Sequence, residues 1–219
     1  MNITHATTEQ IKGDRLQVIF NRQKELMEKY HHIEKRSGLL QTDSCPVNLD
    51  DKAGQARIKD FAWRLTEELG EALDAKQSNN TEHFVEELID GLHFLTELTI
   101  LAGKDYDTVM DFESLPSKGD NLRKLHIEGA EYFYHQGSSF SQTLTSFIRE
   151  IGMLCNCLKN KPWKQSHMRT DIDLFYHRLR KVWISYFAIL FAAGMSHADV
   201  ADIYLKKSQV NKFRQRSNY

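Results

Sequence analysis

Apolar residues recur every three to four positions along most of this chain, with polar residues between them. This is the periodicity of a helix that buries one face, whereas a half-buried strand alternates apolar and polar positions. The pattern therefore predicts helices throughout and an all-α fold. The segments that carry it are 14–35, 55–76, 82–103, 139–160 and 171–194.

The residues at the ends of these segments are typical of helix boundaries. Asp14, Thr81 and Asp171 each precede an apolar run, where a short side chain with an oxygen can accept hydrogen bonds from the first-turn amides. Gly103 and Gly194 follow two of the runs, where a left-handed residue closes a helix most easily. The three prolines lie in loop-like stretches, so none interrupts a predicted helix.

The predicted helices divide the chain into two halves. We predict a single all-α domain over 1–219, with an acid-rich catalytic half over 14–103 and a second half over 139–219 that ends in a basic segment. Between them, 104–138 begins with a stretch rich in Gly, Asp, Ser and Pro, which favours a linker or insert. The protein is thus predicted to be a helical bundle built from two hairpins.

The two predicted hairpins are similar when they are overlaid. Residues 68–71 align with 150–153, and 89–103 with 180–194, so that apolar positions stay apolar while charged ones change. This favours a duplicated hairpin whose second copy is degenerate, although two amphipathic hairpins can also agree by chance. Three acids change in the second copy: Glu71, Glu87 and Asp90 correspond to Met153, Arg178 and Lys181.

Each helix of the first hairpin carries two acids three residues apart. Glu68 and Glu71 lie on the first helix, Glu87 and Asp90 on the second, and side chains at this spacing share a helix face. A short connection makes the helices antiparallel neighbours, so the four carboxylates can converge. Because the second helix is apolar around most of its circumference, its acids need partners or a cavity. Hard oxygen ligands suit Mg²⁺; the alternative is solvated charges paired with cations such as Lys76.

The end of the chain offers the opposite charge. Residues 206–219 contain lysines and arginines and no acid. Lys207, Asn211 and Arg214 are four and three residues apart, so they share a face if the last helix continues. Ammonium and guanidinium groups can neutralise phosphate oxygens that metal ions do not reach. A loosely ordered basic tail is the alternative.

Several motifs, in this order along the chain, together resemble one known family. The chain resembles the dimeric, all-α dUTPases of the MazG-like pyrophosphohydrolase superfamily, and the resemblance covers most of its length. The motifs are NRQKEL at 21–26, EELGE at 67–71, EELID at 86–90 followed by HF at 93–94, and KSQVNKFRQ at 207–215 before the final Tyr219.

The resemblance implies a role for each acid of the first hairpin. Glu68, Glu71, Glu87 and Asp90 match the family's Mg²⁺ ligands. Glu67, which precedes the first ligand, matches the residue that holds and activates the attacking water. The resemblance therefore implies a site with two or more Mg²⁺ ions, for which Mn²⁺ can substitute.

Other matched positions imply contacts with the substrate. Gln23 matches a glutamine that contacts the base, and Asn211 matches another base or sugar contact. Lys207 and Arg214 match phosphate-binding positions. Trp63 is a candidate to stack on the base, although an aromatic side chain at helical spacing can equally belong to the core. The degenerate second hairpin suggests two further residues that face the triphosphate, Arg178 and Lys181.

Composition narrows the range of partners and compartments. Twenty-nine basic residues against thirty acidic ones leave a net charge of −1, which argues against a general binder of nucleic acid or anionic membranes. The three cysteines form no CxxC pair, which favours a reducing, cytoplasmic setting without disulfides. No run approaches the ~18 apolar residues of a membrane-spanning helix.

The clustered acids, together with what the resemblance implies, lead to one predicted function. We predict Mg²⁺-dependent hydrolysis of a deoxynucleoside triphosphate, foremost dUTP, to the monophosphate and pyrophosphate by a homodimer. Such a reaction needs charge neutralisation and an aligned water more than covalent chemistry. The alternative within the superfamily is a dCTP or purine nucleotide as substrate.

Two alternatives of other classes remain open from the sequence. The spacings Glu28-x-x-His31 and Asp90-x-x-His93 are those of ferritin-like di-iron proteins, although the second half lacks the further carboxylates. A helical adaptor without catalytic activity would use the aromatic second half as its partner surface.

Overall fold

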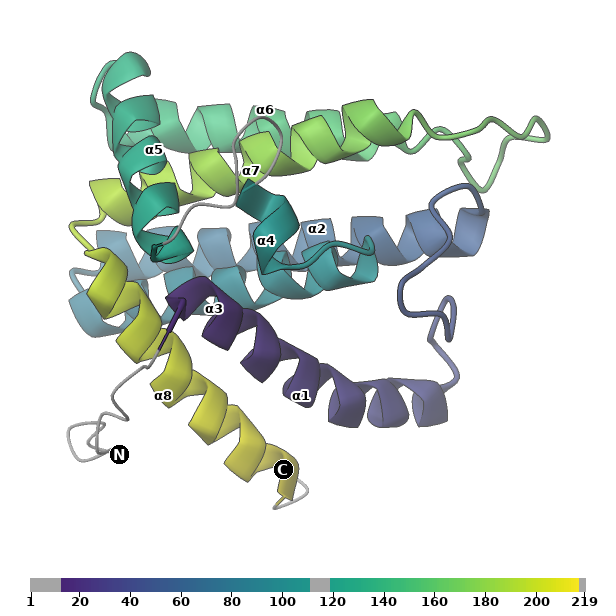
Figure 1. The fold of residues 1–219 in the computed structure, drawn as a ribbon, viewed down its shortest axis with the longest axis horizontal. Helices are drawn as coiled ribbons and strands as arrows, with labels where there is room; N and C mark the ends of the chain where they lie inside the picture. The colour runs from purple at the N-terminus through teal and green to yellow at the C-terminus, as the bar shows by residue number, and fades with distance from the viewer. Residues whose placement is uncertain (1–12, 111–118, 217–219) are drawn as a thin grey trace.

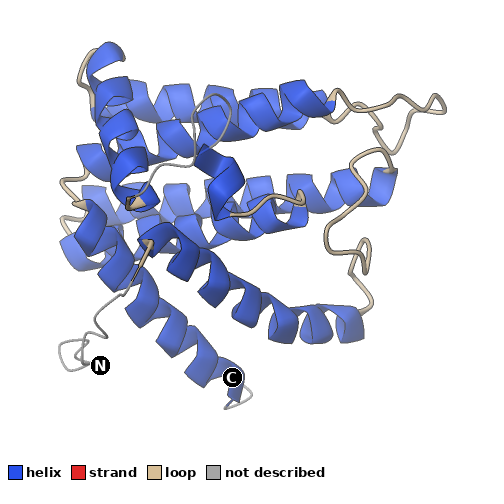
Figure 2. Ribbon diagram, viewed as in Figure 1, coloured by secondary structure: helices blue, strands red, loops and turns tan. Residues whose placement is uncertain are grey.

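The fold consists of helices alone in the part of the chain that the structure describes, residues 13–110 and 119–216 of a computed structural model (Figures 1 and 2). The predicted all-α class is therefore confirmed. Every segment predicted to be helical is helical, and three more helices are present. The helices are α1 Arg15–Ser37, α2 Lys52–Gln77, α3 Thr81–Leu101, α4 Tyr106–Met110, α5 Asn121–His135, α6 Phe140–Cys157, α7 Ile172–Ala192 and α8 His197–Arg216.

Two antiparallel hairpins, α2–α3 and α6–α7, run along the long axis of the molecule, while α1 and α8 cross beside α3 (Figure 1). Helix α3 packs against α1, α2, α7 and α8, which explains its apolar circumference. The core between the hairpins holds the fully buried rings of Trp183 and Tyr186 on α7. Their polar atoms are satisfied by α3: the Trp183 indole donates to Thr99 Oγ1 at 2.9 Å, and the Tyr186 hydroxyl to the Leu88 carbonyl at 2.6 Å.

The helix boundaries agree with the capping residues, with one correction. The carboxylates of Asp14 and Asp171 cap α1 and α7 as predicted. Helix α3 is capped by Asn80, whose side chain accepts from the amide of His83, and Thr81 is already the first helical residue. Both glycines predicted to close helices have left-handed backbones, with φ of 82° and 80°.

The expected linker over 104–138 contains two helices, and one of them belongs to the packed core. Helix α5 lies across α7 with Leu122 and Leu125 fully buried. Helix α5 was not predicted because its apolar stripe is short: its buried positions are two leucines and a glycine, with charged residues between them. The glycine, Gly129, lies against the α7 backbone: a Cβ there would be 2.6 Å from the Phe187 carbonyl carbon.

We expect Gly129→Ala to destabilise the protein, because the backbone of α7 cannot move aside for the added methyl group. The expected loss is about 3 kcal/mol, the upper end for overpacking, or a Tm lower by roughly 6–12 °C at this chain length. Gly152→Ala in α6 is the matched control, since a Cβ there meets nothing within 4 Å. It should stabilise by up to about 1 kcal/mol through helix propensity. Equal melting temperatures for the two variants would contradict the close contact of α5 and α7.

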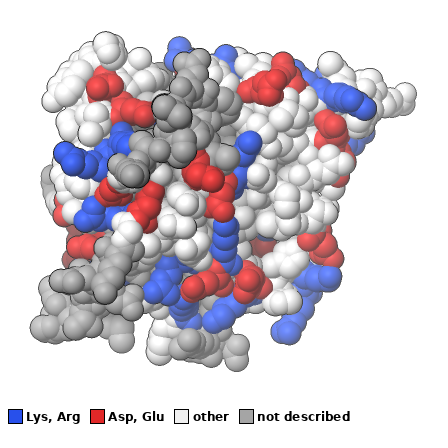
Figure 3. All heavy atoms as spheres, viewed as in Figure 1, with Lys and Arg blue, Asp and Glu red and all other residues white. Residues whose placement is uncertain are grey.

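Charges are mixed on the face of the molecule shown in Figure 3, where acidic and basic side chains alternate without a continuous patch of one sign. Within the described residues, no single helix is long and apolar enough to cross a membrane. Only α7 and residues 197–214 taken together, with a bend of 99° between them, reach that length and composition.

Candidate active site

The four acids of the α2–α3 hairpin gather where the two helices face each other. Oxygens of Glu68, Glu87 and Asp90 lie within 4.8 Å of one another. Glu71 belongs to a second group of the same size, which it forms with Glu87 and His83. Glu87 is shared by the two groups, so the sequence-predicted metal ligands form one continuous cluster.

The cluster carries more negative charge than its surroundings offset. Burial, a hydrogen bond to Glu87 and repulsion from the other acids raise the pKa of Glu68 from 4.5 to about 8. Burial also raises the pKa of Asp90, against the opposing effect of its hydrogen bond to Lys207. Divalent cations bound by carboxylate oxygens relieve this kind of repulsion. The donor set and its charge therefore fit Mg²⁺ or Mn²⁺.

The raised pKa of Glu68 has a consequence for stability. Because the folded state holds this proton more tightly than the unfolded state, the metal-free protein loses stability as pH rises from about 4.5 to about 8. Glu68→Gln should remove that loss and raise stability at pH 8 by ~1–2 kcal/mol after solvent screening, or roughly 2–8 °C in Tm. Thermal unfolding with a chelator at pH 5 and pH 8 measures it.

The control for this measurement is Glu67→Gln, which removes the neighbouring but exposed carboxylate. It should leave the dependence of Tm on pH close to that of the wild type. If Glu68→Gln were no more stable than the wild type at pH 8, the repulsion among the clustered acids would not exist.

His83 is a site residue that the sequence analysis did not single out. Its Nδ1 lies 2.9 Å from Glu87 Oε1, and the ring is partly exposed near the start of α3. The spacing of four residues between His83 and Glu87 was the available signal, since such side chains meet on a helix. His83 adds a nitrogen donor at the edge of the carboxylate cluster.

Helix α8 brings cationic and amide groups to the acids. Lys207 Nζ lies 2.8 Å from Asp90 Oδ2, with only 14% of the lysine side chain exposed. Asn211, one turn further along α8, lines the small cavity described below together with Asp90. The predicted shared face of Lys207 and Asn211 therefore faces the acid-rich hairpin.

His93 fixes the position of α8 on α3. Its ring stacks on Tyr204, with centroids 3.9 Å apart, and its Nδ1 lies 2.9 Å from the Ile89 carbonyl. A carbonyl can only accept, so Nδ1 carries the proton, and Nε2 lies 3.1 Å from Ser208 Oγ, whose single hydroxyl proton is shared between Nε2 and the Tyr204 carbonyl at 2.9 Å. Burial lowers the pKa of His93 to about 4, which keeps the ring neutral. Both ring nitrogens are thus engaged. Because the contact with His93 fixes Ser208, it also holds the adjacent residue, Lys207, beside Asp90.

A cavity of about 300 Å³ opens beside the acidic cluster. It contains four residues predicted from sequence to bind metal or substrate: Glu68, Asp90, Gln23 and Asn211. Acids and amides thus share one cavity. The remaining lining residues are Leu26, Tyr30, Glu34, Arg64, His93, Phe94 and Glu97.

Gln23 is held inside this cavity at both ends of its amide. Its Nε2 donates to Glu97 Oε2 at 2.8 Å, and its Oε1 accepts from the Tyr204 hydroxyl at 2.8 Å. Burial raises the pKa of Glu97 to about 7. Glu97 and Tyr204 were not predicted. An acid two turns beyond Asp90 on an apolar helix was a signal for Glu97, whereas Tyr204 lies 181 positions from Gln23 and had none.

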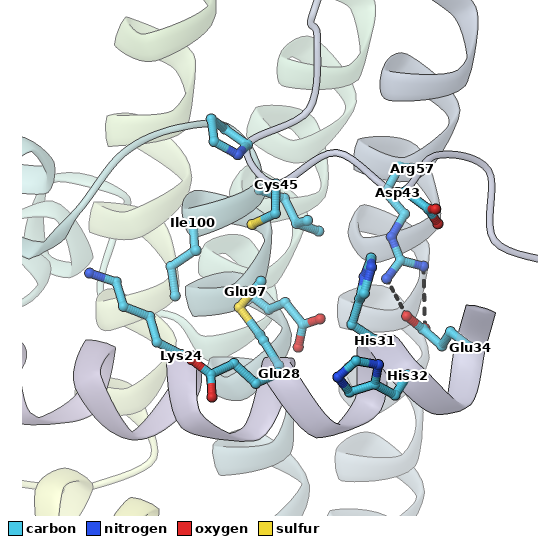
Figure 4. A pocket seen from close by; sticks show the side chains of 13 residues that line it. Lys24, Glu28, His31, His32, Glu34, Asp43, Cys45, Arg57, Glu97 and Ile100 are labelled. Carbon is cyan, nitrogen blue, oxygen red and sulfur yellow. Dashed lines mark hydrogen bonds and ion pairs between the residues drawn. The ribbon is translucent and has the colours of Figure 1, made fainter. Parts of the chain in front are cut away.

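A larger cavity of about 640 Å³ lies on the other side of Glu97 (Figure 4). It is enclosed by α1, the loop around Cys45, α2 and α3, and Glu34 and Glu97 line both cavities. Arg57 donates to the Glu34 carboxylate from both terminal guanidinium nitrogens, drawn as dashed lines in Figure 4. Glu34 and Glu97 therefore form the boundary between the two cavities, and Arg57 lies on the side of the larger one.

Glu67, Trp63 and Arg214 lie outside the acidic cluster and the small cavity. Glu67 is exposed on α2, where its Oε1 accepts from the indole of Trp63 at 2.7 Å, and Trp63 is itself 63% exposed. Arg214 is exposed near the end of α8 and does not line the cavity. Tyr219 lies outside the described residues.

The second hairpin does not direct Arg178 and Lys181 to the cavity. Arg178 Nη1 lies 3.3 Å from Glu150, a carboxylate only 2% exposed that needs a nearby cation, and Lys181 is half-buried further along α7. In the overlay, Glu150 and Arg178 correspond to Glu68 and Glu87. An ion pair therefore occupies the position that two carboxylates occupy in the first hairpin.

The geometry does not support the di-iron alternative. Glu28 and His31 line the larger cavity, apart from Asp90. Neither residue belongs to a group of clustered ligand atoms within the described residues, and His93 has both nitrogens engaged. The two acid–histidine spacings in the sequence therefore do not meet in one site.

Comparison with known proteins identifies the family of this chain. The dUTPase family model matches residues 15–219, which include both hairpins and α8. A search of curated proteins finds no match, and neither does a search of solved structures. Since the family match extends over nearly the whole chain and the fold is all-α, this protein belongs to the all-α dUTPase family.

Proposed function

We propose that this protein hydrolyses dUTP to dUMP and pyrophosphate with the help of Mg²⁺, as a homodimer. Membership in the dUTPase family supports the reaction. The observation that carries the metal dependence is the convergence of Glu68, Glu71, Glu87 and Asp90, whose charge raises the pKa of Glu68 to about 8.

The acids would hold the metal ions, and the rest of the site would place the substrate. Bound Mg²⁺ would neutralise phosphate oxygens and polarise the attacking water. Lys207, at 2.8 Å from Asp90, would neutralise phosphate oxygens next to the metal site. Gln23 and Asn211 line the same cavity and would contact the base and sugar.

Glu67 is the proposed acceptor of the proton from the attacking water. It is adjacent to the ligand Glu68 on α2, and its carboxylate is exposed and held by Trp63. Accepting the proton requires that Glu67 turn from the indole toward the metal-bound phosphates. The exposure of both side chains leaves room for that rotation.

Hydrolysis assays with each deoxynucleoside triphosphate test this proposal. With Mg²⁺ present, we expect dUTP to be converted to dUMP and pyrophosphate and the other nucleotides to react far more slowly. A preference for dCTP or a purine nucleotide would keep the chemistry and change the substrate. No hydrolysis of any nucleotide would contradict the proposal, and sedimentation analysis tests the homodimer separately.

A further inference from the structure

The side-chain amide of Gln23 is bonded to a hydrogen-bond acceptor at its nitrogen and to a hydrogen-bond donor at its oxygen. Its nitrogen faces the carboxylate of Glu97 and its oxygen faces the hydroxyl of Tyr204, each at 2.8 Å. The partners come from α3 and α8, whereas Gln23 is on α1. All of them are buried: Gln23 is 3% exposed and Glu97 7%.

The two partners fix which way the amide points. Above its pKa of about 7 the Glu97 carboxylate is ionised and only accepts hydrogen bonds, so the Gln23 nitrogen must face it. Burial holds the pKa of Tyr204 well above its ordinary value, so its hydroxyl keeps a proton to donate to the amide oxygen. A turned amide would place its oxygen against the Glu97 oxygen and lose both bonds in a buried place.

A fixed amide can distinguish the two pyrimidines of similar shape. Uracil presents an N3–H donor beside an O4 acceptor, whereas cytosine presents an N3 acceptor beside an N4 donor. Each end of the Gln23 amide has one further hydrogen-bonding position besides those that Glu97 and Tyr204 occupy. An amide free to turn would match both bases, but an amide of fixed order matches only one.

We propose that Glu97 and Tyr204 are positioning residues, which fix the donor–acceptor order of Gln23 and thereby make the site discriminate between uracil and cytosine. This inference rests on the proposed function, because Gln23 must face the base of a bound nucleotide. Gln23 lines the cavity that also contains Glu68, Asp90 and Asn211.

Glu97 is separate from the groups that carry the chemistry. Its carboxylate extends from α3 into the space beside α1 (Figure 4) and belongs to neither cluster of candidate metal ligands. Loss of its charge should therefore change the choice of base and leave the hydrolytic step intact. A residue needed only for folding would affect both nucleotides alike.

The test compares kcat/KM for dUTP and dCTP at pH 8 with Mg²⁺. In Glu97→Gln the new amide can present either a donor or an acceptor to Gln23, so the dUTP/dCTP ratio should fall at least ~tenfold. The kcat of this variant for dUTP should stay within about threefold of the wild-type value. The loss of kcat/KM should therefore appear as a higher KM. Glu97→Asp keeps an acceptor-only group and should retain more of the ratio than Glu97→Gln does.

Two more variants complete the test. Tyr204→Phe keeps the ring that stacks on His93 but removes the donor, so it should lower the ratio further when it is combined with Glu97→Gln. Glu28→Gln, an exposed carboxylate of the larger cavity, is the matched control and should leave the ratio unchanged. An unchanged ratio in the double variant would overturn the inference.

Failure of the proposed function would be recognised separately. If the wild-type protein hydrolyses no nucleotide, the proposed reaction fails, and calorimetric titration with dUMP and dCMP then decides the inference. Preference for dUMP that the double variant loses supports the positioning role. Equal affinities in the wild type contradict it.

Discussion

Glu87→Gln is expected to reduce dUTP hydrolysis by about a thousandfold or more, because metal-bound oxygens supply the largest share of charge stabilisation in such a site. Glu87 is shared by both groups of clustered ligand atoms, so its loss weakens every candidate metal position. The substitution keeps the size of the side chain and leaves an oxygen facing His83. The loss should therefore appear in steady-state rates with saturating Mg²⁺, while circular dichroism stays unchanged.

The matched control is Glu82→Gln, which removes an exposed carboxylate in the first turn of the same helix, outside both groups. It should hydrolyse dUTP at close to the wild-type rate. If Glu87→Gln were as active as Glu82→Gln, the carboxylates of the α2–α3 hairpin would not hold the catalytic metal.

Glu67→Gln is expected to lower kcat by about a hundredfold or more, the usual contribution of a general base. Glu67 is adjacent in sequence to Glu68 and belongs to neither metal group, so metal binding should persist. The measurement is a pair of readings on the same sample, kcat for dUTP and the affinity for Mn²⁺.

Trp63→Phe separates the role of Glu67 from that of its neighbour. The indole holds Glu67 at 2.7 Å, and phenylalanine keeps an aromatic ring without the N–H. Loss of the indole N–H removes only this one hydrogen bond and leaves Glu67 free to turn. The rate of dUTP hydrolysis should therefore change by only a few-fold. Near-normal turnover in Glu67→Gln would mean that another group accepts the proton.

The acids of the site could be predicted from sequence because a helix fixes the relation between nearby positions. Glu68 with Glu71, and Glu87 with Asp90, are three residues apart, and the short connection between α2 and α3 brings the pairs together. The same argument from helical spacing would also have identified His83, which is four residues before Glu87. The all-α fold followed from the same periodicity.

The rest of the site depends on how distant helices pack. Tyr204 reaches Gln23 because His93 and Ser208 fix α8 against α3, and no local spacing encodes that contact. Glu150 shows the limit of sequence alignment: it aligns with Glu68, yet its carboxylate is paired with Arg149 and Arg178. Similar patterns thus gave a cluster of carboxylates in one hairpin and an ion pair in the other.

The central claim is that the carboxylates of α2 and α3 bind divalent cations. The most direct test is titration of the metal-free protein with Mn²⁺, read by electron paramagnetic resonance, with and without a non-hydrolysable dUTP analogue. We predict saturable binding that Mg²⁺ displaces and that Glu87→Gln abolishes. Identical binding in wild type and variant, or no bound Mn²⁺ even with the analogue, would contradict the claim.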